Sequence, residues 1–99
     1  MKDWDKLKKL VHHRDKHICQ SCGKFPSSQV HHIIPRRKDG KDKYNNLITL
    51  CTRCHMLVSP IPDSVLIKLF HINPKELDNE KNKVHRNISK FVSRQNYKA

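Results

Sequence analysis

Four cysteines arranged as two C-x-x-C pairs are the residues of this chain best suited to hold a metal ion. They are Cys19, Cys22, Cys51 and Cys54. Two residues between paired thiolates let both sulfurs reach one ion, and two such pairs make the tetrahedral cage that Zn²⁺ prefers. We expect a structural zinc, because four thiolates leave no open position for water. A rubredoxin-like iron site and a redox-active thiol pair are alternatives, but neither explains the nearby histidines.

Three histidines and an asparagine lie between and beside these cysteine pairs. His31 and His32 fall in the segment VHHIIP, Asn46 in NNLITLC, and His55 directly after the last cysteine. The pattern HHIIP…NNLITLC-x-x-CH, over residues 19–57, resembles the HNH endonucleases, also called ββα-metal or His-Me finger nucleases. The preceding pattern W-x-x-L-x-x-x-V-x-x-R-D also resembles that family. The resemblance implies a metal-dependent DNA endonuclease with a strand–loop–strand–helix core.

The resemblance also implies a role for each of these residues. His32 would be the general base that deprotonates the attacking water, while His31 and His55 would bind a catalytic Mg²⁺ or Mn²⁺, with Ni²⁺ or Zn²⁺ as alternatives. Asn46 would either orient the His32 ring or bind the ion itself. Chemically, an imidazole can activate water while a divalent ion stabilises charge on the phosphate and on the leaving oxygen. Periodicity leaves open which of His31 and His32 faces the ion, because neighbouring strand residues point to opposite faces.

Basic residues greatly outnumber acidic ones. Lys and Arg total 21 against nine Asp and Glu, which gives a formal charge of +12. Four thiolates and one zinc would leave about +10. This excess favours a polyanionic partner, because each neutralised phosphate releases counterions. We expect DNA-phosphate contacts, which position the backbone without reading bases, and hence weak sequence specificity. The expected contact residues are Arg36, Arg37, Lys38, Lys41 and Arg53.

Apolar spacing and turn residues predict the elements that position these side chains. The expected elements are, in chain order, a helix over 3–15, a strand over 29–34, a loop over 36–43, a strand over 47–51 and a helix over 52–58. C-terminal helices should follow, the last one starting at Asn73 and Pro74 and fraying over 94–99. The predicted fold is therefore α+β: a ββα-metal hairpin stapled by a four-cysteine zinc site, flanked by an N-terminal helix and C-terminal helices.

Chain length allows one small domain, which we divide into three parts. They are an N-terminal helix (1–18), the zinc knuckles with the ββα-metal core (19–58) and a C-terminal helical extension (59–99). No segment approaches the ~20 apolar residues needed to cross a bilayer, and the start lacks a run typical of signal peptides. We therefore expect a cytoplasmic protein, where paired cysteines are metal ligands rather than disulfides.

Two other functions use parts of the same pattern. A zinc-ribbon DNA-binding module without catalysis needs the cysteines and the charge, but not the histidines and the asparagine. A protein-interaction adaptor would direct the basic surface at an acidic partner. The resemblance itself is to stand-alone HNH proteins of bacteriophages, some of which act with DNA-packaging (terminase) proteins. One metal and one base predict a nicking enzyme, as a monomer or a weak dimer.

Overall fold

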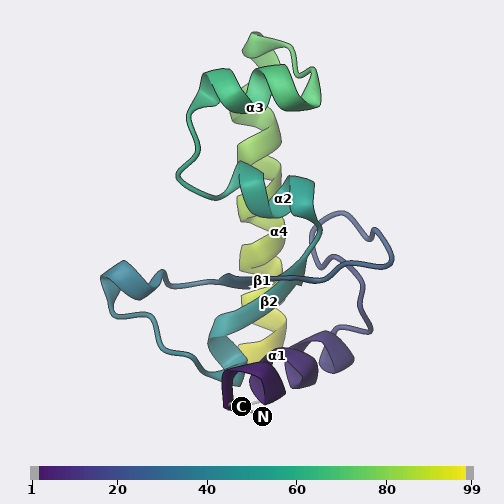
Figure 1. Ribbon diagram of the computed structural model, residues 1–99, viewed down its shortest axis with the longest axis vertical. Coiled ribbons are helices and arrows are strands. Elements are labelled where there is room, and N and C mark those ends of the chain that lie inside the picture. The colour runs from purple at the N-terminus through teal and green to yellow at the C-terminus, as the bar shows by residue number, and fades with distance from the viewer. Residues whose placement is uncertain (1–2, 98–99) are drawn as a thin grey trace.

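A two-stranded antiparallel sheet lies among the helices of the computed structural model, which describes residues 3–97 (Figure 1). Its elements are α1 (Asp3–Arg14), β1 (Gln29–His32), β2 (Leu47–Leu50), α2 (Thr52–Leu57), α3 (Asp63–Phe70) and α4 (Leu77–Tyr97), with 3₁₀ turns η1 (Arg36–Lys38), η2 (Tyr44–Asn46) and η3 (Pro74–Glu76). The long helix α4 extends from α3 at one end of the molecule to α1 at the other (Figure 1). The predicted α+β fold is confirmed.

The sheet register places the two neighbouring histidines at the end of β1. His31 pairs with Ile48 and His32 with Leu47, so the two rings project from opposite faces of the strand. All four residues of β2 are completely buried, because α1 packs on one side of the sheet and α2 on the other. This burial explains why LITL is a continuous apolar and β-branched run rather than an alternating one.

Helix α4 covers the other elements with one apolar stripe. Leu77, Val84, Ile88 and Phe91 are all at most 7% exposed and pack in the core with the cysteines. At its start, the Asn73 side chain accepts a hydrogen bond from the Lys75 backbone at 2.9 Å, as the Asn-Pro pattern predicts. The predicted fraying over 94–99 is wrong for residues 94–97, which continue the helix, and 98–99 lie outside the described residues.

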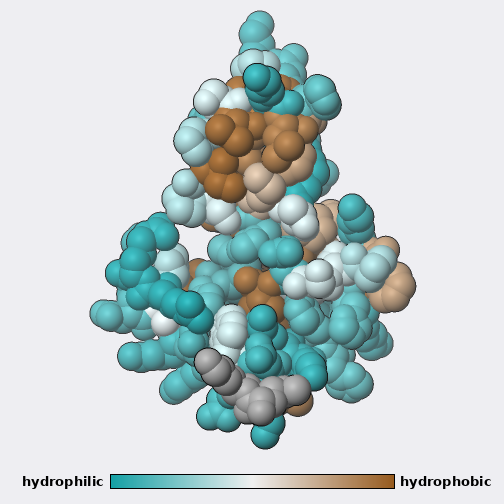
Figure 2. All heavy atoms as spheres, viewed as in Figure 1, coloured by the Kyte–Doolittle hydropathy of each residue, from teal (hydrophilic) through white to brown (hydrophobic). Residues whose placement is uncertain are grey.

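Helix α3 is covered less completely than α4. Leu66 is buried, whereas Val65 and Leu69 are 45% and 52% exposed. Figure 2 shows the resulting hydrophobic area over α3 at the upper end of the molecule, above a mostly hydrophilic surface. Among the described residues, none of the helices combines the length and the apolar character that a membrane span requires.

A buried ion pair attaches α1 to the second strand. Asp15 is 5% exposed, accepts a hydrogen bond from the Thr49 backbone at 2.9 Å and pairs with Arg14 at 2.8 Å. Arg14 also donates to the carbonyl oxygens of Tyr44 and Leu47, at 2.7 and 2.6 Å. The R-D pair of the N-terminal pattern therefore orients the helix against the strand that leads into the cysteine site.

Candidate active site and metal centre

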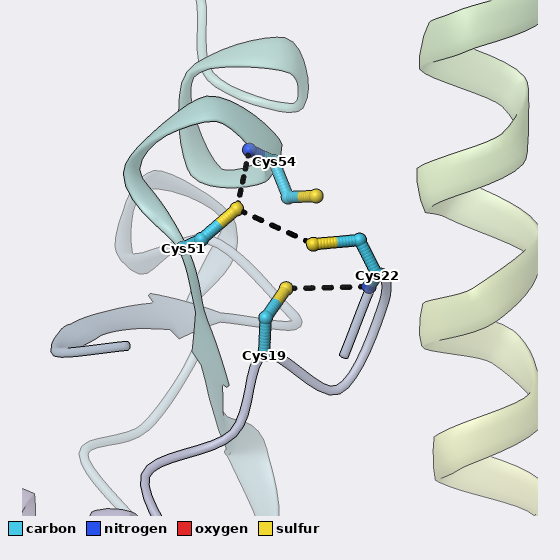
Figure 3. A group of neighbouring side chains, drawn as sticks. All are labelled: Cys19, Cys22, Cys51 and Cys54. Atoms are coloured by element: carbon cyan, nitrogen blue, oxygen red, sulfur yellow. Dashed lines mark hydrogen bonds between the residues drawn. The ribbon is translucent and has the colours of Figure 1, made fainter. Parts of the chain in front are cut away.

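The four cysteines converge from two segments that are far apart in the sequence. Cys19 and Cys22 come from the loop after α1, whereas Cys51 precedes α2 and Cys54 lies on it (Figure 3). All four sulfur atoms lie within 4.8 Å of one another, and those of Cys22 and Cys51 are 3.6 Å apart. All four are free thiols rather than disulfides. The predicted four-cysteine metal cluster is thus present.

Backbone amides and neighbouring thiols prepare this cluster for a cation. The N–H of Cys22 donates to the Cys19 sulfur, and the N–H of Cys54 to the Cys51 sulfur, both at 3.4 Å. A hydrogen bond from the Cys54 thiol, together with the backbone donors, lowers the pKa of Cys19 to about 4. The same hydrogen bond and burial raise the pKa of Cys54. A Zn–S bond of about 2.3 Å requires sulfur separations of about 3.8 Å in a tetrahedron, so the donors fit Zn²⁺.

His31 and His55 form a second cluster on the other side of α2. Their rings, from β1 and α2, have centroids 5.4 Å apart at an interplanar angle of 71°. Burial, and then the charges of His55, His32 and His85, lower the pKa of His31 to about 4, and burial lowers the pKa of His55. Both rings are therefore neutral at neutral pH, and the neutral imidazole is the form that binds metal ions.

The ring of His32 is turned away from His31 and towards α1. It stacks on Trp4 with centroids 5.6 Å apart and planes at 17°, and its side chain is 16% exposed. Its Nε2 lies 2.7 Å from Oδ1 of Asp42. His31, His32 and His55 nevertheless line one hollow together with Arg36 and Arg37. The sequence alone left open the directions in which these two neighbouring rings point. In the structure, the His31 ring lies against His55 and the His32 ring lies against Trp4.

Asn46 closes the loop between the two strands. Its Oδ1 accepts from the Ile34 N–H at 2.9 Å, and its Nδ2 donates to the carbonyl oxygens of Ile34 and Lys41, at 3.1 and 2.9 Å. Gly40 packs tightly against the same loop: a Cβ at this position would lie 1.7 Å from the backbone carbonyl oxygen of Ile34. The Asn46 amide therefore binds the loop backbone, and its two predicted roles, orienting His32 and binding the ion, stay predictions.

The five predicted phosphate contacts separate into groups. Arg36 and Arg37 border the histidine hollow, with Lys38 next to them in η1 and Lys41 beside Asn46. Arg53 faces elsewhere: it pairs with Glu80 of α4 at 3.5 Å and lies 5.6 Å from the centre of the Phe70 ring. The structure therefore brings the arginines of the loop to the histidines, and it does not bring Arg53 there.

Sequence reasoning missed Asp42 and Trp4, which are the two direct neighbours of the His32 ring. In the sequence, Trp4 stands out only as the first residue of the pattern W-x-x-L-x-x-x-V-x-x-R-D, and Asp42 only as part of the expected loop over 36–43. A signal was present in the segment RRKDGKDK, where two acids interrupt a basic run. An acidic side chain repels phosphates, so its presence in a loop that is expected to contact them indicates another role. For Asp42, that role is its contact with His32.

Comparisons with known proteins agree with this geometry. The model of the HNH endonuclease family matches residues 19–60, which contain both cysteine pairs, all three histidines of the hollow and Asn46. Over 81 residues, the chain is 30% identical to the type IV methyl-directed restriction enzyme EcoKMcrA of Escherichia coli (strain K12). The aligned region is 72% of this chain and 29% of that protein, so the similarity concerns one part of a much longer relative.

Proposed function

We propose that the chain is a metal-dependent DNA endonuclease, on the premise that residues 19–60 match the model of the HNH endonuclease family. The observation that carries the proposal is the single hollow in which His31, His32 and His55 meet two arginines. It combines neutral nitrogen donors, a candidate base and cations for phosphate oxygens, which are the parts that phosphodiester hydrolysis requires. The basic excess of the whole chain fits DNA as the substrate.

Each residue of the hollow has one task in this proposal. His31 and His55 would hold Mg²⁺ or Mn²⁺, which supplies positive charge for the phosphate and the leaving oxygen. His32 accepts a proton from water as the water oxygen bonds to phosphorus, the bond from phosphorus to the 3′ oxygen breaks, and a solvent water protonates the departing 3′ oxygen. The products are a 5′-phosphate and a 3′-hydroxyl. Arg36 and Arg37, with Lys38 and Lys41, contact neighbouring phosphates.

The remaining features describe how the domain acts as a whole. We assign Zn²⁺ to the four cysteines as a structural ion, and residues 1–99 to one working unit of helix (1–18), core (19–58) and helical extension (59–99). One base and one catalytic ion favour nicking, and phosphate contacts without base readers favour weak sequence specificity. A bacteriophage source and a DNA-packaging partner stay predictions from the resemblance, and a monomer or a weak dimer stays the prediction from one metal and one base.

A plasmid-nicking assay tests the proposal. The parent protein, His32→Ala and the control His13→Ala, which removes an exposed histidine from α1, are compared in EDTA, Mg²⁺, Mn²⁺ and Ni²⁺. We expect metal-dependent conversion of supercoiled to open-circle DNA, slower by ~10²–10⁴-fold in His32→Ala and unchanged in His13→Ala. Equal rates in His32→Ala and the parent would remove His32 from the role of base. Salt-sensitive DNA binding without cleavage in any metal would instead indicate a DNA-binding module.

A further inference from the structure

We infer that Asp42 is the positioning residue of His32: its carboxylate holds the Nε2–H of the ring and leaves Nδ1 as the nitrogen that accepts the proton from water. This inference rests on the proposed function of His32 as the general base. It goes beyond that function because it names the nitrogen that reacts and the group that selects it.

A short hydrogen bond joins His32 to Asp42. The distance of 2.7 Å from His32 Nε2 to Asp42 Oδ1 is that of a charge-assisted bond. An ionised carboxylate can only accept, so the neutral ring must carry its proton on Nε2 and expose an unprotonated Nδ1. When Nδ1 takes a proton from water, the ring becomes a cation beside a carboxylate. Asp42 therefore stabilises the charged form that the reaction produces.

Two neighbouring side chains, Arg36 and Trp4, hold this pair in place. Arg36 donates to both carboxylate oxygens of Asp42, from Nε at 3.0 Å and from Nη2 at 3.2 Å. The same guanidinium lies 4.9 Å from the centre of the Trp4 ring, and Trp4 stacks on His32. Four side chains from α1, β1, η1 and the following loop thus form a closed ring. Within it, the imidazole has one well-defined orientation.

Asp42 carries a negative charge in a basic loop. A carboxylate close to an anionic substrate repels it, so Asp42 is costly unless it serves His32. The hydrogen bond from His32, and then the one from Arg36, lower the pKa of Asp42, so it stays ionised. Because the Asp42 side chain is 47% exposed, its ion pairs add little to the free energy of unfolding. Substitution of Asp42 should therefore change catalysis without unfolding the domain.

Asp42→Asn, with Asp39→Asn as its matched control, tests the inference. Both changes remove one negative charge from the same exposed loop. Asp39 has a positive φ of 64°, which Asn tolerates well. An amide at position 42 can donate to Nε2 and so favour the tautomer with its proton on Nδ1. We expect the kcat of Asp42→Asn to fall by about 10–100-fold or more, with KM for DNA and the melting temperature equal to those of Asp39→Asn.

Ring-nitrogen NMR shifts of His32 give a readout that does not depend on activity. We expect the proton on Nε2 in the parent and in Asp39→Asn, and on Nδ1 in Asp42→Asn. A parent ring protonated on Nδ1, or an unchanged kcat in Asp42→Asn beside an inactive His32→Ala, would overturn the inference and leave the nuclease proposal intact. Full activity of His32→Ala would overturn both the role of His32 and this inference.

Discussion

The rings of His31 and His55 meet edge to face with centroids 5.4 Å apart, although 24 positions separate them in the sequence. Strand β1 supplies one ring and helix α2 the other. Burial is the main cause of the lowered pKa of both, so each offers a neutral ring nitrogen to the hollow. Two neutral imidazoles held close together by separate elements support the proposal that His31 and His55 bind a divalent ion.

Loss of either ring should therefore weaken metal binding. We expect His31→Ala and His55→Ala to lower the affinity for Mn²⁺ by about 100-fold or more, since even outer partners of a ligand are worth 10–100-fold. Isothermal titration of zinc-loaded protein measures this affinity directly. His32→Ala serves as the comparison, because the proposed base is not a proposed ligand. Unchanged Mn²⁺ affinity after both substitutions would show that the catalytic ion binds elsewhere.

Asn46→Ala should loosen the loop over residues 34–41 and slow cleavage. The substitution removes three hydrogen bonds to the loop backbone, each worth about 0.5–1.5 kcal/mol. Amide hydrogen exchange should quicken at Ile34, whose N–H loses its acceptor, and kcat should fall because Asp42 and Arg36 leave their positions. Asn45→Ala, at the exposed neighbouring position, is the control. Slow exchange at Ile34 in Asn46→Ala would contradict the role of this amide.

Asp15→Ala should be among the most destabilising single substitutions in the domain. It leaves the Arg14 guanidinium, at 10% side-chain exposure, without its carboxylate and the Thr49 N–H without an acceptor. Breaking a buried ion pair in this way costs about 3–5 kcal/mol. By contrast, Asp5→Ala removes a carboxylate from the exposed pair with Lys8 and should cost ~1 kcal/mol or less. Denaturant unfolding of both variants measures the difference, and equal stabilities would refute it.

Features set by local spacing could be predicted from the sequence. The two C-x-x-C pairs predicted a cluster because two residues between sulfurs suffice to define a knuckle. Helical geometry alone aligns Leu77, Val84, Ile88, Phe91 and Val92 on one face, and the first four of these are buried in α4. The two strands were predicted by their β-branched and apolar residues, although β1 ends at His32 rather than at position 34.

Contacts between distant segments could not be predicted in this way. His32 contacts Asp42, which lies in a loop, and Trp4, which lies on helix α1. No sequence periodicity relates these three positions. Arg53 lies between the two cysteines of the second pair in the sequence, yet its ion pair with Glu80 depends on how α4 crosses α2. The two possible roles of Asn46 also came from the family resemblance. Its actual partners are backbone groups, which every residue carries and no sequence pattern marks.

Cys51→Ser should remove the metal and much of the stability together. Cys51 is 5% exposed, accepts the N–H of Cys54 and lies in the core cluster. A hydroxyl there opens the thiolate cage, and the binding energy of a structural zinc contributes to folding. We expect less than one zinc per chain by metal analysis and a large fall in melting temperature, which a chelator reproduces in the parent. Full thermal stability in Cys51→Ser would contradict a structural site.

His12 should make the domain less stable as the pH falls. Its Nδ1 lies 3.0 Å from the hydroxyl of buried Thr49, and burial, followed by the charge of His17, lowers its pKa below the ordinary 6.5. Lys8 lowers it further, and Asp15 acts in the opposite direction.

The unfolded chain therefore binds the His12 proton more tightly than the folded one. This difference has no effect above the unfolded pKa of 6.5, and it destabilises the fold as the pH drops through that value. His12→Gln lacks the titration, whereas the exposed control His13→Gln keeps it. In melts of zinc-saturated protein from about pH 7.5 to about pH 5.5, the parent and His13→Gln should lose stability relative to His12→Gln. Parallel curves for all three proteins would show that His12 does not take part.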